Sequence, residues 1–368
     1  MVLVLFFRRI DSFTNIKKEI KKGTIFVSIA SYRDAECSMT VRTIYNKARY
    51  PERIFLGICE QNKEQELEKC VSSDPEVNKY LKNIRFSNMP YTEAKGPSYA
   101  RYHCSKLWDG EEYFLQIDSH TFFESDWDIN LIEMLEQCKQ TDLPENSHQW
   151  GTSGSKRPVL SVYPPSAEQM NTLGFPEMDN GKISDANIPI FLAGFRDYTS
   201  TKPTRSPKPF YAAGFMFLDS TFLYDIPYDP TLNHLFQGEE VLFSARLFTH
   251  GYDAFTPNKK VGYHHYSRQG PLYWNDNKTT HDENRIKSEQ KVLKLLGLHC
   301  SNDTDANANN YGLGTFRNID DFWKASGIKV ENGKIKEISR WTSDTRNENT
   351  GGWCFCQDHY TNIKKYDL

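Results

Sequence analysis

The sequence predicts an α/β fold, with a mostly parallel sheet flanked by helices. Two observations carry this prediction: apolar, β-branched runs alternate with segments of helical spacing, and each apolar run ends abruptly in polar residues. A strand, a helix and a second strand joined by short connections form a βαβ unit, whose right-handed crossover makes the two strands parallel. Ligands bind at the carboxyl ends of such strands, so the polar residues there are the first candidates for a site.

The first 140 residues contain the clearest elements. The run at 24–30 ends at Ser31 and the run at 54–59 ends at Glu60, so both predict buried strands that open into polar loops. Gly96 and Pro97 introduce a helix. The elements expected in this part are strands at 24–30, 54–59, 84–86 and 113–118, and helices at 37–48, 63–69, 77–81, 99–107 and 127–138.

The middle of the chain is less regular. Residues 141–209 are rich in proline, glycine, serine and asparagine, and we expect mostly long loops there, with one strand at 159–163. Loops of that length in a compact domain are usually functional. The elements expected beyond them are a strand at 211–218, helices at 239–250 and 283–296, and a further piece at 311–327.

Composition excludes several functional classes. A formal net charge of -3 argues against a bulk attraction to nucleic acid or to an anionic membrane. The apolar run at residues 1–7 is too short to span a membrane, and Arg8 and Arg9 follow it where a signal peptide would place its basic residues first. We therefore expect no membrane span and a cytoplasmic location.

The cysteines agree with that location. Eight of them are scattered without the spacing of a small disulfide scaffold, which favours reduced thiols. Cys354 and Cys356 form a lone pair near the end of the chain, and no second pair completes a zinc site.

The strand at 113–118 ends in a carboxylate and an imidazole two residues apart. Asp118 and His120 point to the same side of a strand, because residues i and i+2 share a face, and can grip one metal ion. Carboxylate and imidazole suit a Mn²⁺-like ion, which neutralises the charge of a leaving diphosphate. The alternative is a strand that simply runs into a polar turn.

Three further groups of residues carry chemistry. Arg101 lies one turn inside a helix, where it could bind phosphate. Small residues at 212–214 permit a ligand to approach the backbone. Glu239 and Glu240 begin a helix, where the macrodipole favours carboxylates whatever their function, and either could orient a hydroxyl or act as a general base.

Two adjacent histidines precede a possible phosphate ligand. His264 and His265 point to opposite faces if they lie on a strand, so only one can join Asp118 and His120 around a metal ion. Arg268 follows closely and could bind the same diphosphate.

Taken in order, these motifs resemble the GT-A glycosyltransferases that attach sugars to polypeptide hydroxyls. The likeness is greatest to the cytoplasmic Skp1-type UDP-GlcNAc:hydroxyproline polypeptide N-acetylglucosaminyltransferases, and a more distant one exists to the polypeptide GalNAc-transferases. The motifs that carry it are SYRD at 31–34, GPSYAR at 96–101, LQIDSH at 115–120, AAGFMF at 212–217, QGEE at 237–240 and HHYSR at 264–268.

The resemblance covers about residues 24–327 and implies the fold and domains. The GT-A fold has a mixed, mostly parallel sheet with a Rossmann-like nucleotide-binding half, flanked by helices. We expect an N-terminal extension at 1–22, a catalytic domain at 23–270, and a C-terminal segment at 271–368 that packs on the catalytic domain.

The resemblance also implies roles for single residues. Asp118, His120 and His265 would bind Mn²⁺ or Mg²⁺, with His264 as the alternative third ligand. Glu239, Glu240 and Arg268 would be the catalytic residues. The residues that would hold the nucleotide are Ser31, Arg33, Glu60, Arg101, Ile117, Asp118, Ser119, Gly214 and Arg268. Relatives often have paired aspartates near Glu60, so this sequence departs from the family there.

The implied activity is a retaining, metal-dependent transfer of N-acetylglucosamine from UDP-GlcNAc to a polypeptide hydroxyl, on hydroxyproline, threonine or serine. A UDP-GalNAc or other UDP-sugar transferase is one alternative. Another is an inverting enzyme in which Glu239 or Glu240 is the base. The third is a non-catalytic binding module on a GT-A scaffold.

Overall fold

The computed structural model describes residues 17–63, 69–71, 74–141, 156–169, 174–197, 200–267, 270–277, 281–298 and 310–338. The strands are β1 (Lys21–Tyr32), β2 (Ile54–Asn62), β3 (Ile84–Pro90), β4 (Glu111–Asp118), β5 (Thr121–Phe123), β6 (Arg157–Ser161), β7 (Gly174–Ile183), β8 (Pro189–Asp197), β9 (Thr204–Arg205), β10 (Phe215–Asp219), β11 (Tyr252–Thr256), β12 (Gly262–His264), β13 (Ile328–Glu331) and β14 (Lys334–Ile338). The helices are α1 (Cys37–Lys47), α2 (Pro75–Asn78), α3 (Pro97–Lys106), α4 (Trp127–Gln140), α5 (Phe222–Asp225), α6 (Glu239–Thr249), α7 (Tyr273–Asp276), α8 (His281–Leu295) and α9 (Ile319–Ser326).

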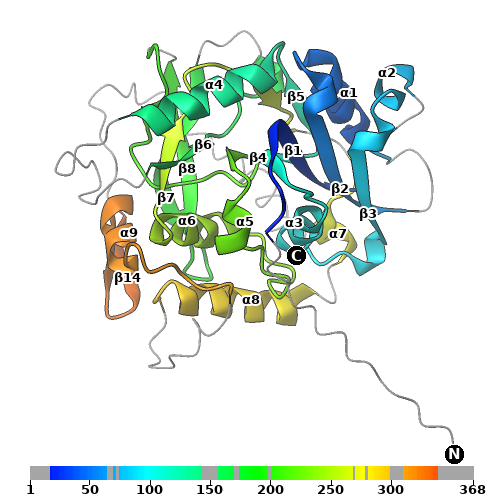
Figure 1. The fold of residues 1–368 in the computed structure, drawn as a ribbon. Helices are drawn as coiled ribbons and strands as arrows, with labels where there is room; N and C mark the ends of the chain where they lie inside the picture. The colour runs from blue at the N-terminus through cyan, green and yellow to red at the C-terminus, as the bar shows by residue number, and fades with distance from the viewer. Residues whose placement is uncertain are drawn as a thin grey trace, which may run out of the picture.

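A mixed sheet forms the centre of the molecule (Figure 1). Within the described residues its strand order is β3-β2-β1-β4-β10-β6-β11-β9. The first four strands are parallel, as the βαβ pattern predicts. β10 then runs antiparallel to both β4 and β6. β5 and β12 form a separate antiparallel pair beside the end of β4.

Helices cover both faces of the sheet, and the alternation along each strand explains why. Ile25, Val27 and Ile29 of β1 pack in a core shared with α1 and α4. Phe26 of β1 and Phe114 of β4 face the opposite core, which α5, α6 and α8 close. Figure 1 shows α1 and α4 on one side of the sheet and α5, α6 and α8 on the other.

The predicted elements of the first 140 residues agree with β1–β4, α1, α3 and α4, whereas the expected helix at 63–69 falls largely outside the described residues. The prediction of mostly long loops at 141–209 was wrong for 174–197, where β7 and β8 form an antiparallel hairpin. Glycine and proline lowered the strand signal there, and tertiary packing overrides it. Phe191 of β8 stacks on Phe210 with ring centroids 3.8 Å apart. β11 was also missed.

The prediction of reduced thiols was also wrong for one pair of cysteines. Cys37, at the start of α1, forms a disulfide with Cys70, 33 residues away. That separation exceeds any local spacing pattern, so the sequence offers no cue. Cys59, Cys104 and Cys138 are buried free thiols, and Cys354 and Cys356 lie outside the described residues.

The part of the chain after residue 270 contributes to the main core where it is described. Val292 and Leu296 from the α8 region and Phe322 and Trp323 from α9 pack in the core that also contains residues of α6. Arg246 of α6 donates to the carbonyl of Gly312 at 3.2 Å. None of the described helices is long and apolar enough to cross a membrane.

Candidate active site

Asp118 ends β4 at the point where the sheet changes direction. β4 is parallel to β1 and antiparallel to β10, so Ile117 lies between Ile29 and Phe215. The Ile117 side chain packs in the core, although the resemblance implied contact with the nucleotide. Asp118 is the residue at which β4 leaves this core, and its side chain is 33% exposed.

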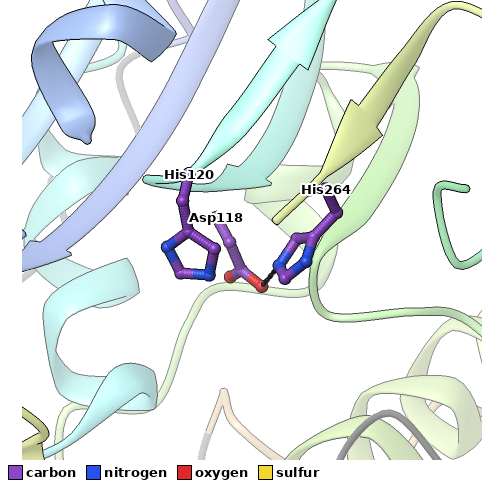
Figure 2. A group of neighbouring side chains, drawn as sticks. All are labelled: Asp118, His120 and His264. Atoms are coloured by element: carbon purple, nitrogen blue, oxygen red, sulfur yellow. Dashed lines mark hydrogen bonds and ion pairs between the residues drawn. The ribbon is translucent and has the colours of Figure 1, made fainter. Parts of the chain in front are cut away.

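Asp118, His120 and His264 form one cluster, which Figure 2 shows. One ligand atom from each residue lies within 4.8 Å of the others. His264 Nε2 is 3.1 Å from Asp118 Oδ2, and the two imidazole rings have centroids 4.5 Å apart. The pairing of β12 with β5 explains this placement, because it sets His264 opposite Thr121, directly after His120.

His265, the expected third ligand, lies outside this cluster, and the histidine beside Asp118 and His120 is His264, the alternative. His265 Nδ1 is 2.7 Å from the carboxylate of Glu36, and its Nε2 is 3.4 Å from Glu168. Neighbouring residues at a strand end point in opposite directions, and the register of β12 aims His264 inward.

Arg101 bridges two carboxylates. Its side chain is 5% exposed, it donates to Asp118 Oδ1 at 3.0 Å, and it forms an ion pair with Glu239. Burial opposes its charge, but Glu239 and Asp118 raise the pKa of Arg101 above the ordinary value. Arg101 therefore holds Asp118 and the start of α6 together in this structure.

Gly214 leaves no space for a side chain beside Asp118. A Cβ at this position would lie 2.8 Å from Asp118 Oδ2, whereas Cβ atoms in proteins essentially never approach another heavy atom within 3.0 Å. Gly214 directly precedes β10, whose pairing with β4 brings it there. This is the close backbone approach that the small residues at 212–214 predict.

Glu239 and Glu240 begin α6, after Gly238 with a φ of +103°. Glu240 accepts from Tyr163 Oη at 2.7 Å and from the Ala213 amide at 2.9 Å. Burial raises the pKa of both carboxyls, that of Glu240 to about 7. Glu239 has Arg101 as a cationic partner, whereas the donors to Glu240 among the described residues are the neutral Tyr163 hydroxyl and Ala213 amide.

A cavity of about 260 Å³ lies against these groups. The cavity is lined by the cluster, by Arg101 and both glutamates, and by residues of the β7–β8 hairpin and several aromatic side chains. Its lining residues that no quoted motif contains include Tyr163, Lys182, Phe191 and Trp274. Lys182 and Phe191 come from the part that was expected to be loops, so no local pattern marked them.

The other expected nucleotide contacts lie near the same strand ends, and none of the following four lines the cavity. Ser31 is buried and faces Glu60 across β1 and β2. Glu60 accepts from the Cys70 amide at 2.7 Å, and burial raises its pKa. Arg33 pairs with Asp276 at 2.8 Å, and Ser119 donates to Asp34. Arg268 lies outside the described residues.

The side chains of the cluster are in the protonation states that a divalent cation requires. Burial and His120 lower the pKa of His264 to about 4, so its ring is neutral at pH 7. Burial opposes ionisation of Asp118, but His264 and Arg101 lower its pKa below the ordinary range. A metal site needs this combination of a neutral imidazole and an ionised carboxylate. The Nδ1 of His264 is buried without a hydrogen-bond partner among the described groups.

The mixed sheet and the Asp-x-His cluster at its strand ends are features that the resemblance to the GT-A glycosyltransferases predicts. The family model described as Glycosyltransferase (GlcNAc) matches residues 24–80 and 68–332. Since this is most of the sequence, the chain belongs to that family.

Two of the solved structures to which the chain is similar are those of GalNAc-T7 and S. aureus TarS. The structure of GalNAc-T7 with UDP, GalNAc and Mn²⁺ is 14% identical in sequence, with a TM-score of 0.48. The match covers 82% of this chain and 54% of the GalNAc-T7 chain. The structure of S. aureus TarS, residues 1–349 with UDP-GlcNAc, is 13% identical in sequence, with a TM-score of 0.43. That match covers 77% of this chain and 69% of the TarS chain. The chain thus spans about half of the GalNAc-T7 chain that it matches. No curated protein sequence matches it significantly.

Proposed function

We propose that this protein transfers N-acetylglucosamine from UDP-GlcNAc to a polypeptide hydroxyl, with retention of the sugar's α linkage and with Mn²⁺ as cofactor. The proposal rests on family membership. The observation that carries it is the cluster of Asp118, His120 and His264 at the edge of a cavity. The Skp1-type resemblance of the sequence supports the donor and the acceptor.

The three residues of the cluster would hold the cation. A divalent cation bound there would neutralise the charge that develops on the departing diphosphate. Arg101 lines the same cavity and holds Asp118 at 3.0 Å, so its positive charge also adds to the field at the site. Arg101 is therefore proposed to act on the phosphates through Asp118 and the local field.

Retention needs no nucleophile from the protein. The acceptor hydroxyl can attack from the face that the diphosphate leaves, passing its proton to the departing phosphate oxygen. Glu239 is held by Arg101 and Glu240 by Tyr163 and the Ala213 amide, so both carboxylates are fixed in orientation. Their proposed role is to position hydroxyls of the sugar or acceptor.

One observation favours an inverting enzyme as the second candidate. The pKa of Glu240 is raised to about 7 by burial, which suits a general base near neutral pH. Glu239 suits this role less, because its carboxylate is paired with Arg101. Product NMR separates the two candidates, since retention yields an α linkage and inversion by Glu240 a β linkage.

The acceptor residue depends on the compartment. The Skp1-type resemblance supports hydroxyproline on a cytoplasmic protein, and the expected cytoplasmic location stays a prediction. The Cys37–Cys70 disulfide speaks against it, because disulfides persist mainly in oxidising compartments. An oxidising compartment would instead favour threonine or serine as the acceptor.

A donor screen tests the proposal without any acceptor. Several UDP-sugars are incubated with the full chain, and hydrolysis is scored with Mn²⁺ and with chelator. We expect Mn²⁺-dependent hydrolysis that is fastest with UDP-GlcNAc, and loss of it in Asp118→Ala, His120→Ala and His264→Ala. His265→Ala is the matched control and keeps most of the turnover. Full turnover in Asp118→Ala with metal present would remove the metal site from the mechanism.

A further inference from the structure

Asp34 stands directly behind one imidazole of the cluster. It lies in the turn between β1 and α1, is 1% exposed, and its Oδ2 is 2.8 Å from His120 Nδ1. The same oxygen accepts from the Ser119 hydroxyl at 2.5 Å. The other oxygen, Oδ1, accepts from the Glu36 amide at 3.0 Å. Asp34 is therefore a buried carboxylate whose hydrogen bonds converge on the residues beside Asp118.

A carboxylate in this position fixes the tautomer and the orientation of the imidazole. When Nδ1–H donates to the carboxylate, the proton is held on Nδ1 and the lone pair of Nε2 is free for an ion. The bond also fixes the plane of the ring. We propose that Asp34 is the positioning residue of this site, orienting His120 so that Nε2 faces the ion between Asp118 and His264. This inference rests on the proposed function.

The two imidazoles of the cluster differ in what lies behind them. His264 uses Nε2 toward Asp118, and its Nδ1 has no hydrogen-bond partner among the described groups. His120 has the Asp34 carboxylate on its Nδ1. Within the described cluster, the orientation of His264 thus comes from its strand, whereas that of His120 comes from Asp34.

The turn that carries Asp34 is anchored from several sides. The Cys37 amide donates to the Asp34 carbonyl at 3.2 Å, and Cys37 is itself tied to Cys70 by the disulfide. One turn into α1, Thr40 Oγ1 donates to the Ser119 carbonyl at 2.7 Å and accepts from the Thr121 amide at 3.1 Å. The start of α1 and the turn after β4 therefore form one hydrogen-bonded unit. This unit allows Asp34 to hold the His120 imidazole in a fixed orientation.

The same turn contains a matched control. Glu36 lies two residues after Asp34, and its carboxylate is 2.7 Å from His265 Nδ1. This is the same kind of bond to a histidine that lies outside the cluster. Glu36→Gln weakens a carboxylate–imidazole bond in the same turn without touching the three ligands, whereas Asp34→Asn weakens the one behind His120.

The test measures metal binding, with MnCl₂ titrated into the metal-free full chain by calorimetry. Loss of a carboxylate behind a metal-bound histidine typically weakens affinity about 10- to 100-fold, and we expect this for Asp34→Asn. Glu36→Gln should stay within about twofold of the wild type, since His265 contributes no ligand. The electron paramagnetic resonance spectrum of bound Mn²⁺ should change in Asp34→Asn only. Turnover of that variant should recover as Mn²⁺ is raised, which a general structural defect would not allow.

A double variant separates positioning from structure. In a His120→Ala background, Asp34→Asn should change the residual Mn²⁺ affinity little, because the imidazole that it orients is gone. If Asp34→Asn does not fold, Asp34→Ser replaces it, since serine keeps an oxygen for the Glu36 amide. Equal Mn²⁺ affinity of the wild type and the Asp34 variant overturns the inference and leaves the proposed function standing. A wild type that binds no Mn²⁺ overturns the proposed function, and the inference with it.

Discussion

Replacing Gly214 by alanine tests the geometry of the site with a single methyl group. The added carbon would lie 2.8 Å from Asp118 Oδ2 and 3.5 Å from its Cγ. The carboxylate is not free to yield, because Arg101 donates to Oδ1 at 3.0 Å and His264 Nε2 lies 3.1 Å from Oδ2. The methyl group therefore acts on a carboxylate that is held on both sides.

The size of the effect follows from these distances. An ordinary contact starts near 3.4 Å, so Asp118 Oδ2 and the new carbon must separate by about 0.6 Å. A functional site tolerates about 0.5 Å, and a displacement near 1 Å can cost about 100-fold in rate. We expect Gly214→Ala to lower Mn²⁺-dependent hydrolysis of UDP-GlcNAc about 10- to 100-fold. The fold should remain, because Gly214 is not among the residues with positive φ.

The assay combines hydrolysis, Mn²⁺ titration and thermal unfolding. Gly297→Ala is the control, since Gly297 has a φ of +67° and nothing within 4 Å of the added carbon. The control should lose stability through its backbone and keep its turnover. Unchanged turnover and Mn²⁺ affinity in a folded Gly214→Ala protein would show that the contact with Asp118 does not constrain the site, and would refute the reasoning.

Three other changes have defined outcomes. Arg101→Met leaves Asp118 and Glu239 without their shared cation and should lower the free energy of unfolding by about 3–5 kcal/mol in urea titrations, a loss that an unchanged midpoint would contradict. Burial raises the pKa of Glu240 from 4.5 to about 7, so between these pH values the folded state binds more protons than the unfolded state. The free energy of unfolding therefore falls as the pH rises through this window. This fall amounts to about 3 kcal/mol, and Glu240→Gln should abolish it. Urea titrations at several pH values would then show a free energy of unfolding that depends less on pH. Replacing Cys37 and Cys70 by serine removes a disulfide that joins residues 33 apart and should lower the free energy of unfolding by about 2–4 kcal/mol. Cys138→Ser is the control, because Cys138 is a buried free thiol. An equal loss in this control would show that burial of the sulfur, and not the disulfide, is the cause.

The sequence predicted the parts of the site that are local. Asp118 and His120 lie on one stretch of chain, and a separation of two residues is enough to place them together. The same holds for the ends of β1 and β2, which the apolar runs mark, and for the start of α6 at Glu239. In each case the chemistry depends on a periodicity that a short window contains.

The parts that were missed depend on pairings across the chain. The choice between His264 and His265 is made by the register of β12 on β5, and a shift of one residue would reverse it. The pairing of Arg101 with Glu239 joins positions 138 residues apart. The β7–β8 hairpin, which supplies part of the cavity wall, owes its strands to packing that outweighs their glycine and proline. No local pattern in the sequence reports such pairings.

The change of strand direction beside β4 explains why the site forms where it does. On the parallel side, Ala30 of β1 pairs with Asp118 and β1 continues to Tyr32, so the turn that contains Asp34 lies next to His120. On the antiparallel side, β10 begins where β4 ends, so Gly214 lies against Asp118. The β5–β12 pair then adds His264. Each group thus reaches the end of β4 from a different strand partner, and the site can exist only when both halves of the sheet are assembled.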